Sequence, residues 1–327
     1  MYIALNTIFA LFLMELLFSS VSTAAKIVGT EHKIQSVSAY DQRLLSIYLW
    51  EKHRSDISSR QFENNGRVVL LAHGATISGR VVFDLQIPAY KKGLPYSLMD
   101  YLAGQGYDVF SVDYQNYGRS DHHGCGLCVT TKVAAADLNS AAEYIRSLRH
   151  IDKIYVLGWS WGASTAGLFA QEHPEKVRRL VQYAPYLKTK NPELQLPQDE
   201  FRTVNIDQCC RDDFPLEYTD PGVYEAFAKE ALKWDNRAPN GVLADFATRM
   251  PLIDPKQITV PTIMFFGALD TTCPIDQEEL PEYFRDLATS DKQLIIIPQG
   301  GHALMMMKPR LKFYSAVTHW FELDQES

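Results

Sequence analysis

An apolar run that ends in Gly-x-Ser-x-Gly constrains this chain more than any other feature. Residues 154–157 are Ile-Tyr-Val-Leu, and they lead directly into Gly158-Trp159-Ser160-Trp161-Gly162 and then into a stretch of mostly small residues, 163–170. A strand that turns at once into a helix leaves no room for a Cβ at either glycine, and it holds the central serine on a strained turn. The pattern therefore predicts that the Ser160 hydroxyl projects from the end of a buried strand.

Apolar runs alternate with helical patterns along most of the chain. This alternation predicts an α/β fold with a doubly wound, mostly parallel sheet and right-handed crossovers. The first two strands are expected to form a hairpin around residues 41–43, and the polar segment 51–65 is expected to be a loop. We expect strands at 34–40, 44–50, 68–72, 107–112, 154–158, 177–183, 262–266 and 293–297, and helices at 97–103, 133–148, 161–173, 277–287 and 309–323.

The alternation breaks between residues 185 and 251, where proline-punctuated polar sequence surrounds one helical pattern at 223–234. A stretch of this length is too long for a plain loop inside a compact domain, so it is interpreted as an inserted cap. A chain of 327 residues has the length for one α/β domain with such an insertion. The predicted organisation is a core formed by 25–185 and 252–327, with a cap at 186–251.

The N-terminus has the composition of a secretory leader. Residues 8–21 are apolar except for Glu15 and two serines, and small residues follow at Ser22 and Ala24. We expect residues 1–24 to be a signal peptide cut after Ala24, which predicts a secreted or periplasmic protein. No Lys or Arg precedes the apolar run. An uncleaved membrane anchor and a buried N-terminal helix are the alternatives.

The chain has five cysteines, at positions 125, 128, 209, 210 and 273, and their expected state depends on whether the protein is exported. In an oxidising compartment they are expected to form structural disulfides that join loops over the site, with connectivity left open. An odd number leaves at least one thiol unpaired unless it pairs between chains. The C-x-x-C spacing of Cys125 and Cys128 also allows a redox or zinc site, but no His-x-x-x-His pair supports zinc.

The formal net charge of −7 argues against a nucleic acid partner, because phosphate binding needs a basic surface. After removal of the leader no second apolar segment is long enough to span a membrane.

Two residues further along the chain have the positions that a nucleophilic Ser160 requires. A serine hydroxyl needs a neighbouring base, and that base needs an acid to orient it. Ligands of α/β sheets gather beyond the carboxyl ends of the strands. Asp270 follows the predicted strand 262–266, and His302 follows the strand 293–297 behind a double glycine. The chain order Ser160, Asp270, His302 therefore predicts a catalytic triad.

Acyl transfer also requires donors for a developing oxyanion. The backbone N–H of Trp161 opens the helix after the turn, and we expect it to be one donor. The second is expected from Ala75, in the loop after the strand 68–72, where Gly74 allows a close approach to substrate. The alternative is that His73-Gly74 is only a strand-end turn.

Five short motifs together carry a family resemblance. They are His73-Gly74, Asp113 with Tyr117-Gly118-Arg119-Ser120, the Ser160 turn, Gly267-Ala268-Leu269-Asp270 followed by Pro274, and Gly301-His302. The set resembles the α/β-hydrolase superfamily over residues 67–322, in its esterase, monoglyceride-lipase and serine-aminopeptidase-like branch. The resemblance implies that Asp113 and Arg119 are scaffold residues. Ser160 excludes the epoxide hydrolases and haloalkane dehalogenases of this superfamily, which have Asp at that position.

The predicted function is hydrolysis of a small carboxylic ester or acyl substrate through an acyl-enzyme, with no metal or organic cofactor. Gly74 and Trp159 are expected to contact the substrate, and the indoles of Trp159 and Trp161 to line or narrow the pocket. Two alternatives remain. One is an amide or peptide hydrolase, whose substrate amine could meet the cap carboxylates Asp212, Asp213, Glu217 and Asp220; the other is a non-catalytic binding protein. Acyl-chain length and oligomeric state are left open.

Overall fold

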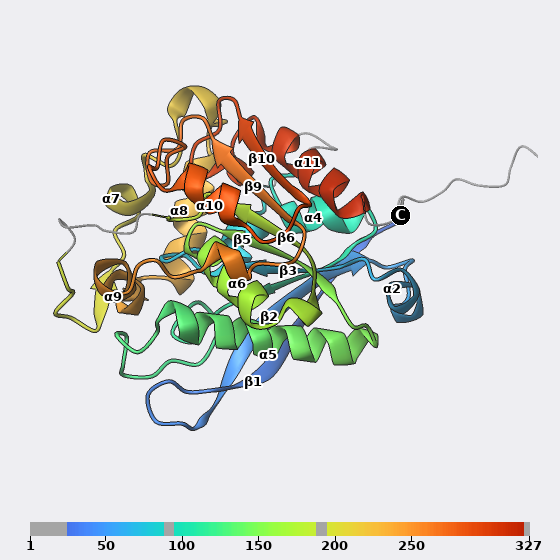
Figure 1. Cartoon of the computed structure of the whole chain (residues 1–327), viewed down its shortest axis with the longest axis horizontal. Coiled ribbons are helices and arrows are strands. Elements are labelled where there is room, and N and C mark those ends of the chain that lie inside the picture. The colour runs from blue at the N-terminus through green and yellow to red at the C-terminus, as the bar shows by residue number, and fades with distance from the viewer. Residues whose placement is uncertain (1–24, 88–94, 188–194, 324–327) are drawn as a thin grey trace, which may run out of the picture.

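A central sheet of eight strands organises the molecule (Figure 1). The computed structural model describes residues 25–87, 95–187 and 195–323, so the predicted leader, 1–24, lies outside the described residues. The strand order is β1-β2-β4-β3-β5-β6-β9-β10, antiparallel between β1, β2 and β4 and parallel from β4 onwards. The strands are β1 (Ile27–Val37), β2 (Leu44–Arg54), β3 (Val68–Ala72), β4 (Asp108–Val112), β5 (Ile154–Trp159), β6 (Val177–Tyr183), β9 (Thr262–Gly267) and β10 (Lys292–Ile297).

Helices cover both faces of the sheet, as a doubly wound fold requires. Helices α5 (Thr131–Arg149) and α6 (Trp161–Glu172) pack together on one face, and α4 (Leu98–Gly104) and α11 (Arg310–Glu322) pack together on the other (Figure 1). Strands β3, β4 and β5 are buried along their whole length. The predicted fold class is confirmed. Helix α10 (Leu280–Asp286) precedes the last strand, and the short helices α2 (Ser59–Asn65) and α3 (Gly79–Phe83) follow β2 and β3.

The expectation that 51–65 is a loop is wrong. Strand β2 continues to Arg54 because β1 pairs with it along its whole length, from Ile27, seven residues before the predicted start. Helix α2 then follows, with a capping box between Ser58 and Gln61. Local caps satisfy the free backbone groups of so short a helix, which is why its polar sequence still folds.

The segment between β6 and β9 contains its own small set of elements. Helix α8 (Val223–Trp234) matches the predicted helical pattern, and β7 (Phe201–Thr203) pairs antiparallel with β8 (Arg237–Pro239). Helices α7 (Ile206–Cys210) and α9 (Gly241–Thr248) complete the set. We call the described residues 195–251 of this segment the cap; the boundaries of the domains themselves stay a prediction.

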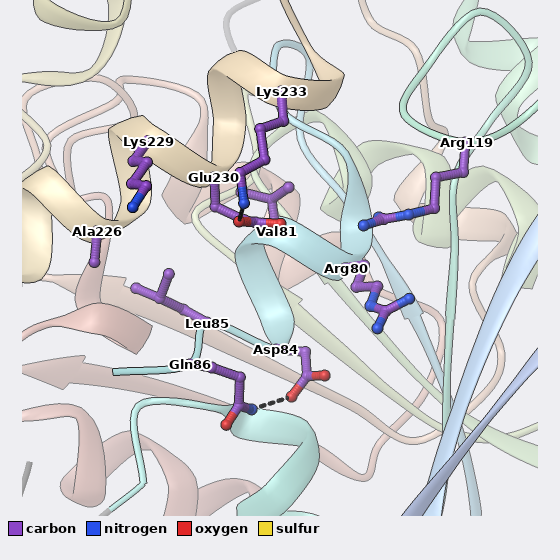
Figure 2. Close-up of a pocket in the computed structure, with 10 residues that line it drawn as sticks. All are labelled: Arg80, Val81, Asp84, Leu85, Gln86, Arg119, Ala226, Lys229, Glu230 and Lys233. Carbon is purple, nitrogen blue, oxygen red and sulfur yellow. Dashed lines mark hydrogen bonds and ion pairs between the residues drawn. The ribbon is translucent and has the colours of Figure 1, made fainter. Parts of the chain in front are cut away.

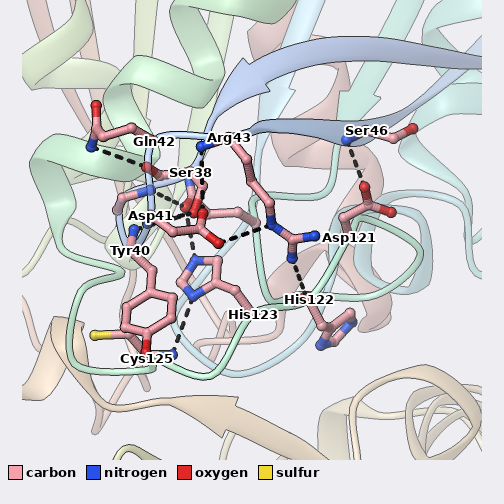
Figure 3. A network of polar contacts seen from close by, with 12 residues as sticks. Ser38, Tyr40, Asp41, Gln42, Arg43, Ser46, Asp121, His122, His123 and Cys125 are labelled. Atoms are coloured by element: carbon pink, nitrogen blue, oxygen red, sulfur yellow. Dashed lines mark hydrogen bonds and ion pairs between the residues drawn. The ribbon is translucent and has the colours of Figure 1, made fainter.

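The loop between β4 and α5 is tied to the β1–β2 hairpin (Figure 3). The backbone N–H of Ser46 donates to Asp121 at 2.8 Å, and the ring of Tyr40 stacks on His123 with centroids 6.0 Å apart. In the same loop the sulfur atoms of Cys125 and Cys128 are in direct contact. This pair closes a local loop and does not join two distant segments.

No helix within the described ranges combines the length and the apolar composition needed to cross a membrane. In the same ranges no three His, Cys, Asp or Glu side chains are grouped so that they could hold a metal ion.

Candidate active site

Ser160 occupies the sharp turn that the glycine spacing predicts. Strand β5 ends at Trp159, α6 begins at Trp161, and Ser160 between them has a φ of +58°. A Cβ at Gly158 would overlap the carbonyl oxygen of Gly162, and one at Gly162 would overlap that of Ala72. A positive φ at a residue with a side chain costs free energy, which the surrounding packing must offset. The turn therefore depends on both glycines.

Asp270 and His302 form a hydrogen-bonded pair at the same edge of the sheet. They follow β9 and β10, which are parallel, so their carboxyl ends lie side by side. Nδ1 of His302 donates to Oδ2 of Asp270 at 2.8 Å, while the other carboxylate oxygen accepts from the backbone N–H groups of Thr272 and Cys273 at 2.9 and 2.8 Å. A carboxylate acceptor keeps the hydrogen on Nδ1, so Nε2 is the basic nitrogen of the neutral ring.

The electrostatic surroundings of His302 favour its protonated form. Burial alone would lower the pKa of this histidine, but the negative charges of Asp270 and Asp213, together with the hydrogen bond to Asp270, raise it above its ordinary value. A raised pKa makes the imidazole of His302 a stronger base, which favours transfer of a proton to it from a hydroxyl.

His73 orients the loop after β3. It is fully buried, and burial lowers its pKa to about 3, so the ring is neutral at physiological pH. The carbonyl oxygen of Gly74 can only accept, so Nδ1 carries the hydrogen and donates to it at 2.8 Å. Nε2 then accepts from the backbone N–H of Tyr114 at 3.2 Å.

The position of the Gly74 carbonyl determines the direction of the next amide. In a trans peptide the C=O of Gly74 and the N–H of Ala75 point in opposite directions. Because His73 holds the carbonyl, the Ala75 N–H is held on the other side of the peptide plane. The next carbonyl, of Ala75, accepts from the Tyr117 hydroxyl at 2.7 Å and from Nη2 of Arg202, a cap residue, at 2.6 Å. The loop is thus fixed at two successive peptides.

A cavity of about 190 Å³ joins these elements. Ser160 and His302 both line it, although no hydrogen bond joins their side chains within the described structure. The bond between a nucleophile and its base commonly tightens only when substrate is bound. The lining residues are Gly74, Ala75, Thr76, Ile77, Trp159, Ser160, Tyr186, Cys209, Cys210, Asp213, Phe246, Thr272, Cys273 and His302.

The two indoles beside Ser160 have different positions. Trp159 lines the cavity, its Nε1 donates to the carbonyl of His302 at 2.9 Å, and its ring lies 5.2 Å from the imidazole. Trp161 is fully buried, and its Nε1 donates to Thr131 at 2.8 Å. The expectation that both indoles line the pocket is therefore wrong for Trp161, because the first side chain of α6 is directed into the core. Only its backbone N–H, which precedes the first helical hydrogen bonds, remains as a possible donor.

The cap supplies one of the four carboxylates that the sequence suggested without distinguishing between them. Of the four cap carboxylates, only Asp213 lines the cavity. Asp212 and Glu217 are exposed, and Asp220 contacts the Tyr96 hydroxyl. Burial raises the pKa of Asp213, with the charge of His302 and a hydrogen bond from Thr272 acting against that rise. Nothing in the spacing of these four residues distinguishes Asp213, because its position depends on how the cap packs.

A second cavity, of about 370 Å³, lies between α3 and α8 and shares no lining residue with the first (Figure 2). Most of its charges are already compensated: Glu230 pairs with Lys233 at 2.5 Å, and Asp84 with Lys52 at 2.7 Å. Arg119 lies over the Trp234 ring at 3.7 Å and so joins the core to α8, in keeping with a scaffold role. The cavity beside Ser160 is therefore the candidate active site.

Known proteins resemble this chain in both sequence and fold. Among curated sequences, epoxide hydrolase 2 of Siraitia grosvenorii is 25% identical over 187 residues, 56% of this chain and 54% of that protein. The chain thus spans about half the length of that relative. A probable proline iminopeptidase of Leptolyngbya boryana is 21% identical over 287 residues, 74% of this chain and 83% of that protein.

Solved structures show the same fold. An esterase from Thermogutta terrifontis superposes with a TM-score of 0.62 at 17% identity, covering 90% of this chain and 98% of that one. A monoacylglycerol lipase from Paleococcus ferrophilus has a TM-score of 0.58 at 17% identity, covering 77% and 93%. The family model described as serine aminopeptidase, S33, matches residues 93–308, which include Ser160, Asp270 and His302. The chain therefore belongs to the serine aminopeptidase S33 family of the α/β-hydrolase superfamily.

Proposed function

We propose that this protein is a serine hydrolase that cleaves small carboxylic esters. The observation that carries the proposal is the meeting of three features at one cavity: Ser160 on its strained turn, the hydrogen-bonded pair of His302 and Asp270, and the fixed loop at Ala75. Each feature supplies one requirement of acyl transfer: a nucleophile, an oriented base and a donor for the oxyanion.

In the proposed reaction, Oγ of Ser160 attacks the ester carbonyl carbon while Nε2 of His302 takes the hydroxyl proton. The negative charge on the former carbonyl oxygen is stabilised by the backbone N–H groups of Ala75 and Trp161. Collapse of this tetrahedral intermediate breaks the bond to the alcohol, which leaves with the proton from His302. Water, deprotonated by His302, then attacks the acyl-enzyme and releases the acid. Asp270 keeps the imidazole in the productive tautomer and stabilises its cation.

The size of the cavity supports a small acyl group. Pockets for drug-sized ligands are usually about 300–1,000 Å³, whereas the cavity beside Ser160 has about 190 Å³. We therefore propose short-chain esters as the substrate class. Phe246 of the cap forms part of the wall and lies against Tyr186, with ring centroids 4.5 Å apart, so these rings limit the length of an acyl chain.

The test is a series of p-nitrophenyl esters from acetate to palmitate, measured beside aminoacyl p-nitroanilides. We expect turnover to be highest from acetate to butyrate. Ser160→Ala should lower ester turnover by at least about 10⁴-fold. Ser164→Ala is the matched control, because Ser164 is a buried serine of α6 whose hydroxyl has no hydrogen-bond partner in the described structure. Ester turnover that survives Ser160→Ala would contradict the proposal.

Amide or peptide hydrolysis is the second candidate, and Asp213 is the observation that favours it. A largely buried carboxylate beside Ser160 could receive the free amine of an aminoacyl substrate. Turnover of the anilides alone would favour this candidate over the ester hydrolase. Turnover of neither substrate class would favour a non-catalytic binding protein.

We also propose export, with residues 1–24 as a leader cut after Ala24, and disulfides within the pairs Cys125–Cys128 and Cys209–Cys210. N-terminal sequencing of exported protein tests the cut, and mass spectrometry after alkylation, with and without reductant, tests the disulfides. Retention of residues 1–24, or alkylation of every cysteine without reductant, would contradict it.

A further inference from the structure

Asp213 brings a second carboxylate into the catalytic centre from the cap. Its residue is only 8% exposed, and it lines the cavity that contains Ser160 and His302. One carboxylate oxygen, Oδ1, accepts a hydrogen bond from the hydroxyl of Thr272 at 2.9 Å. Burial of a carboxylate costs free energy unless it is paired or hydrogen-bonded. The hydroxyl of Thr272 supplies such a hydrogen bond, so Asp213 is held in the cavity by a specific partner.

Thr272 connects this carboxylate to the catalytic acid. Its hydroxyl donates to Asp213, and its backbone N–H donates to Oδ1 of Asp270 at 2.9 Å. A single residue thus contacts both acids, one from the cap and one from the loop after β9. Thr272 thus links the cap at Asp213 to the loop that holds Asp270.

The backbone around Asp213 is docked on the histidine loop as well. The carbonyl oxygen of Asp213 accepts from the backbone N–H of Ala303 at 3.2 Å, one residue after His302. A Cβ on Gly301 would lie 3.0 Å from that carbonyl oxygen and 3.0 Å from Cδ of Pro215, so a side chain there would fit only if the cap segment moved slightly away. The glycine before His302 therefore allows the close approach of the cap.

We propose that Asp213 is a positioning residue for the hydrolytic reaction: it holds the cap against both catalytic loops and stabilises the imidazolium that forms on His302. The inference rests on the proposed function for its chemistry. When Ser160 attacks, a proton moves to Nε2 of His302 and the ring becomes positively charged. A second negative charge in a poorly solvated site stabilises that cation, and its effect is greater there than it would be in water.

The charges around His302 are consistent with this role. Asp270 faces it from the loop after β9 and Asp213 from the cap, while the hydroxyl of Tyr183, at the end of β6, donates to the His302 carbonyl oxygen at 2.9 Å. Cys273 and Ser160 also line the cavity. Both carboxylates raise the pKa of His302, against the effect of burial. Asp213 itself interacts electrostatically with Asp270 and His302, which are buried, and with Asp212, which is exposed. Burial raises the pKa of Asp213.

The experiment measures the titration of His302 directly. Histidine-selective ¹⁵N labelling and NMR, with His302→Gln for assignment, give its pKa in the whole protein without any substrate. The test variant is Asp213→Asn, which keeps an oxygen acceptor for Thr272 but removes the charge. The matched control is Asp212→Asn, which removes an exposed charge one residue away. Thr272→Val removes the hydroxyl donor, and Thr272→Ser retains it.

We expect Asp213→Asn to lower the pKa of His302 by about one unit, the lower end of the effect of a near opposite charge. The acid limb of the pH profile of kcat/KM for p-nitrophenyl acetate should move to lower pH by the same amount. The kcat should fall about threefold to tenfold with little change in KM, because this substrate carries no charge that Asp213 could bind. Asp212→Asn should leave both measurements unchanged. Thr272→Val should lower kcat, and Thr272→Ser should restore it.

The inference is overturned if the pKa of His302 is unchanged in Asp213→Asn and a thermal melting curve shows that this variant is folded. If Asp213→Asn instead unfolds, the Thr272 pair decides: equal kcat for Thr272→Val and Thr272→Ser overturns the inference, and a lower kcat for the valine variant supports it. Failure of the proposed function is distinguishable from both results. It appears as a lack of turnover that depends on Ser160, while the NMR titration still shows whether Asp213 acts on His302.

Discussion

Replacement of His73 by two isosteric amides separates its two hydrogen bonds. An Asn side chain can place its N–H₂ group near the position of Nδ1, so His73→Asn retains the bond to the Gly74 carbonyl. A Gln side chain can place its oxygen near the position of Nε2, so His73→Gln retains the bond from the Tyr114 N–H. Each variant loses one buried bond, and each should lower the free energy of unfolding by about 1–3 kcal/mol.

The two variants should differ in catalysis although they are similar in stability. Only the bond to Gly74 orients the peptide that carries the Ala75 N–H. Its loss in His73→Gln removes one of the two proposed oxyanion donors from its position, and loss of such a donor lowers kcat by about 10²–10³-fold. His73→Asn should keep kcat near that of the wild type. We therefore expect a large difference in kcat between two variants with similar unfolding midpoints.

The assay combines urea denaturation with kcat for p-nitrophenyl acetate at one temperature and pH. His319→Gln serves as the control, because His319 is exposed on α11 and lies outside the cavity. Equal kcat values for His73→Asn and His73→Gln would refute the role of the Gly74 bond. A loss of kcat confined to His73→Asn would refute it as well, since that result would assign the effect to Tyr114.

Two further predictions concern contacts between core and cap. Burial, with the nearby Asp113, raises the pKa of Asp235 to about 7, so its contribution to stability is fully present below about pH 4 and is lost as pH rises through 7. Asp235→Asn should therefore remove up to about 4 kcal/mol of the pH dependence of the unfolding free energy between pH 4 and 8, measured by urea denaturation; an unchanged pH dependence would contradict this. Arg202→Met removes the donor to the Ala75 carbonyl and should lower kcat by at least about tenfold. Arg237→Met, whose guanidinium lies over Phe201, should not change kcat, and equal values for the two arginine variants would argue against the prediction.

The longer helices and strands could be predicted because their sequence signals are local. The apolar run 177–183 and the helical pattern 223–234 match β6 and α8 at both ends. The segment 51–65 could not be predicted from composition, since β2 is extended by pairing with β1 and α2 depends on its caps. The shorter elements β7, β8 and α7 also lack a periodic signal, because each has five residues or fewer.

The same distinction applies to the site. Ser160, Asp270 and His302 are predictable because each follows a strand of one parallel sheet, and parallel strands present their carboxyl ends at a common edge. The site positions of Asp213 and Arg202 could not be predicted in this way. Arg202 lies in β7, a strand of the cap, and Asp213 does not follow a strand of the central sheet. Their contacts with Thr272 and Ala75 join residues far apart in the sequence.

Hydrophobic periodicity and glycine spacing are local signals, so they predict the α/β architecture, the strained turn at Ser160 and the chain order of the residues around the cavity. Three other features could not be predicted in this way: which cap carboxylate lines the cavity with His302, which indole is buried in the core, and which way the Ala75 amide points. These outcomes depend on the docking of one segment on another, where steric fit at Gly301 and hydrogen bonds from distant residues determine the result.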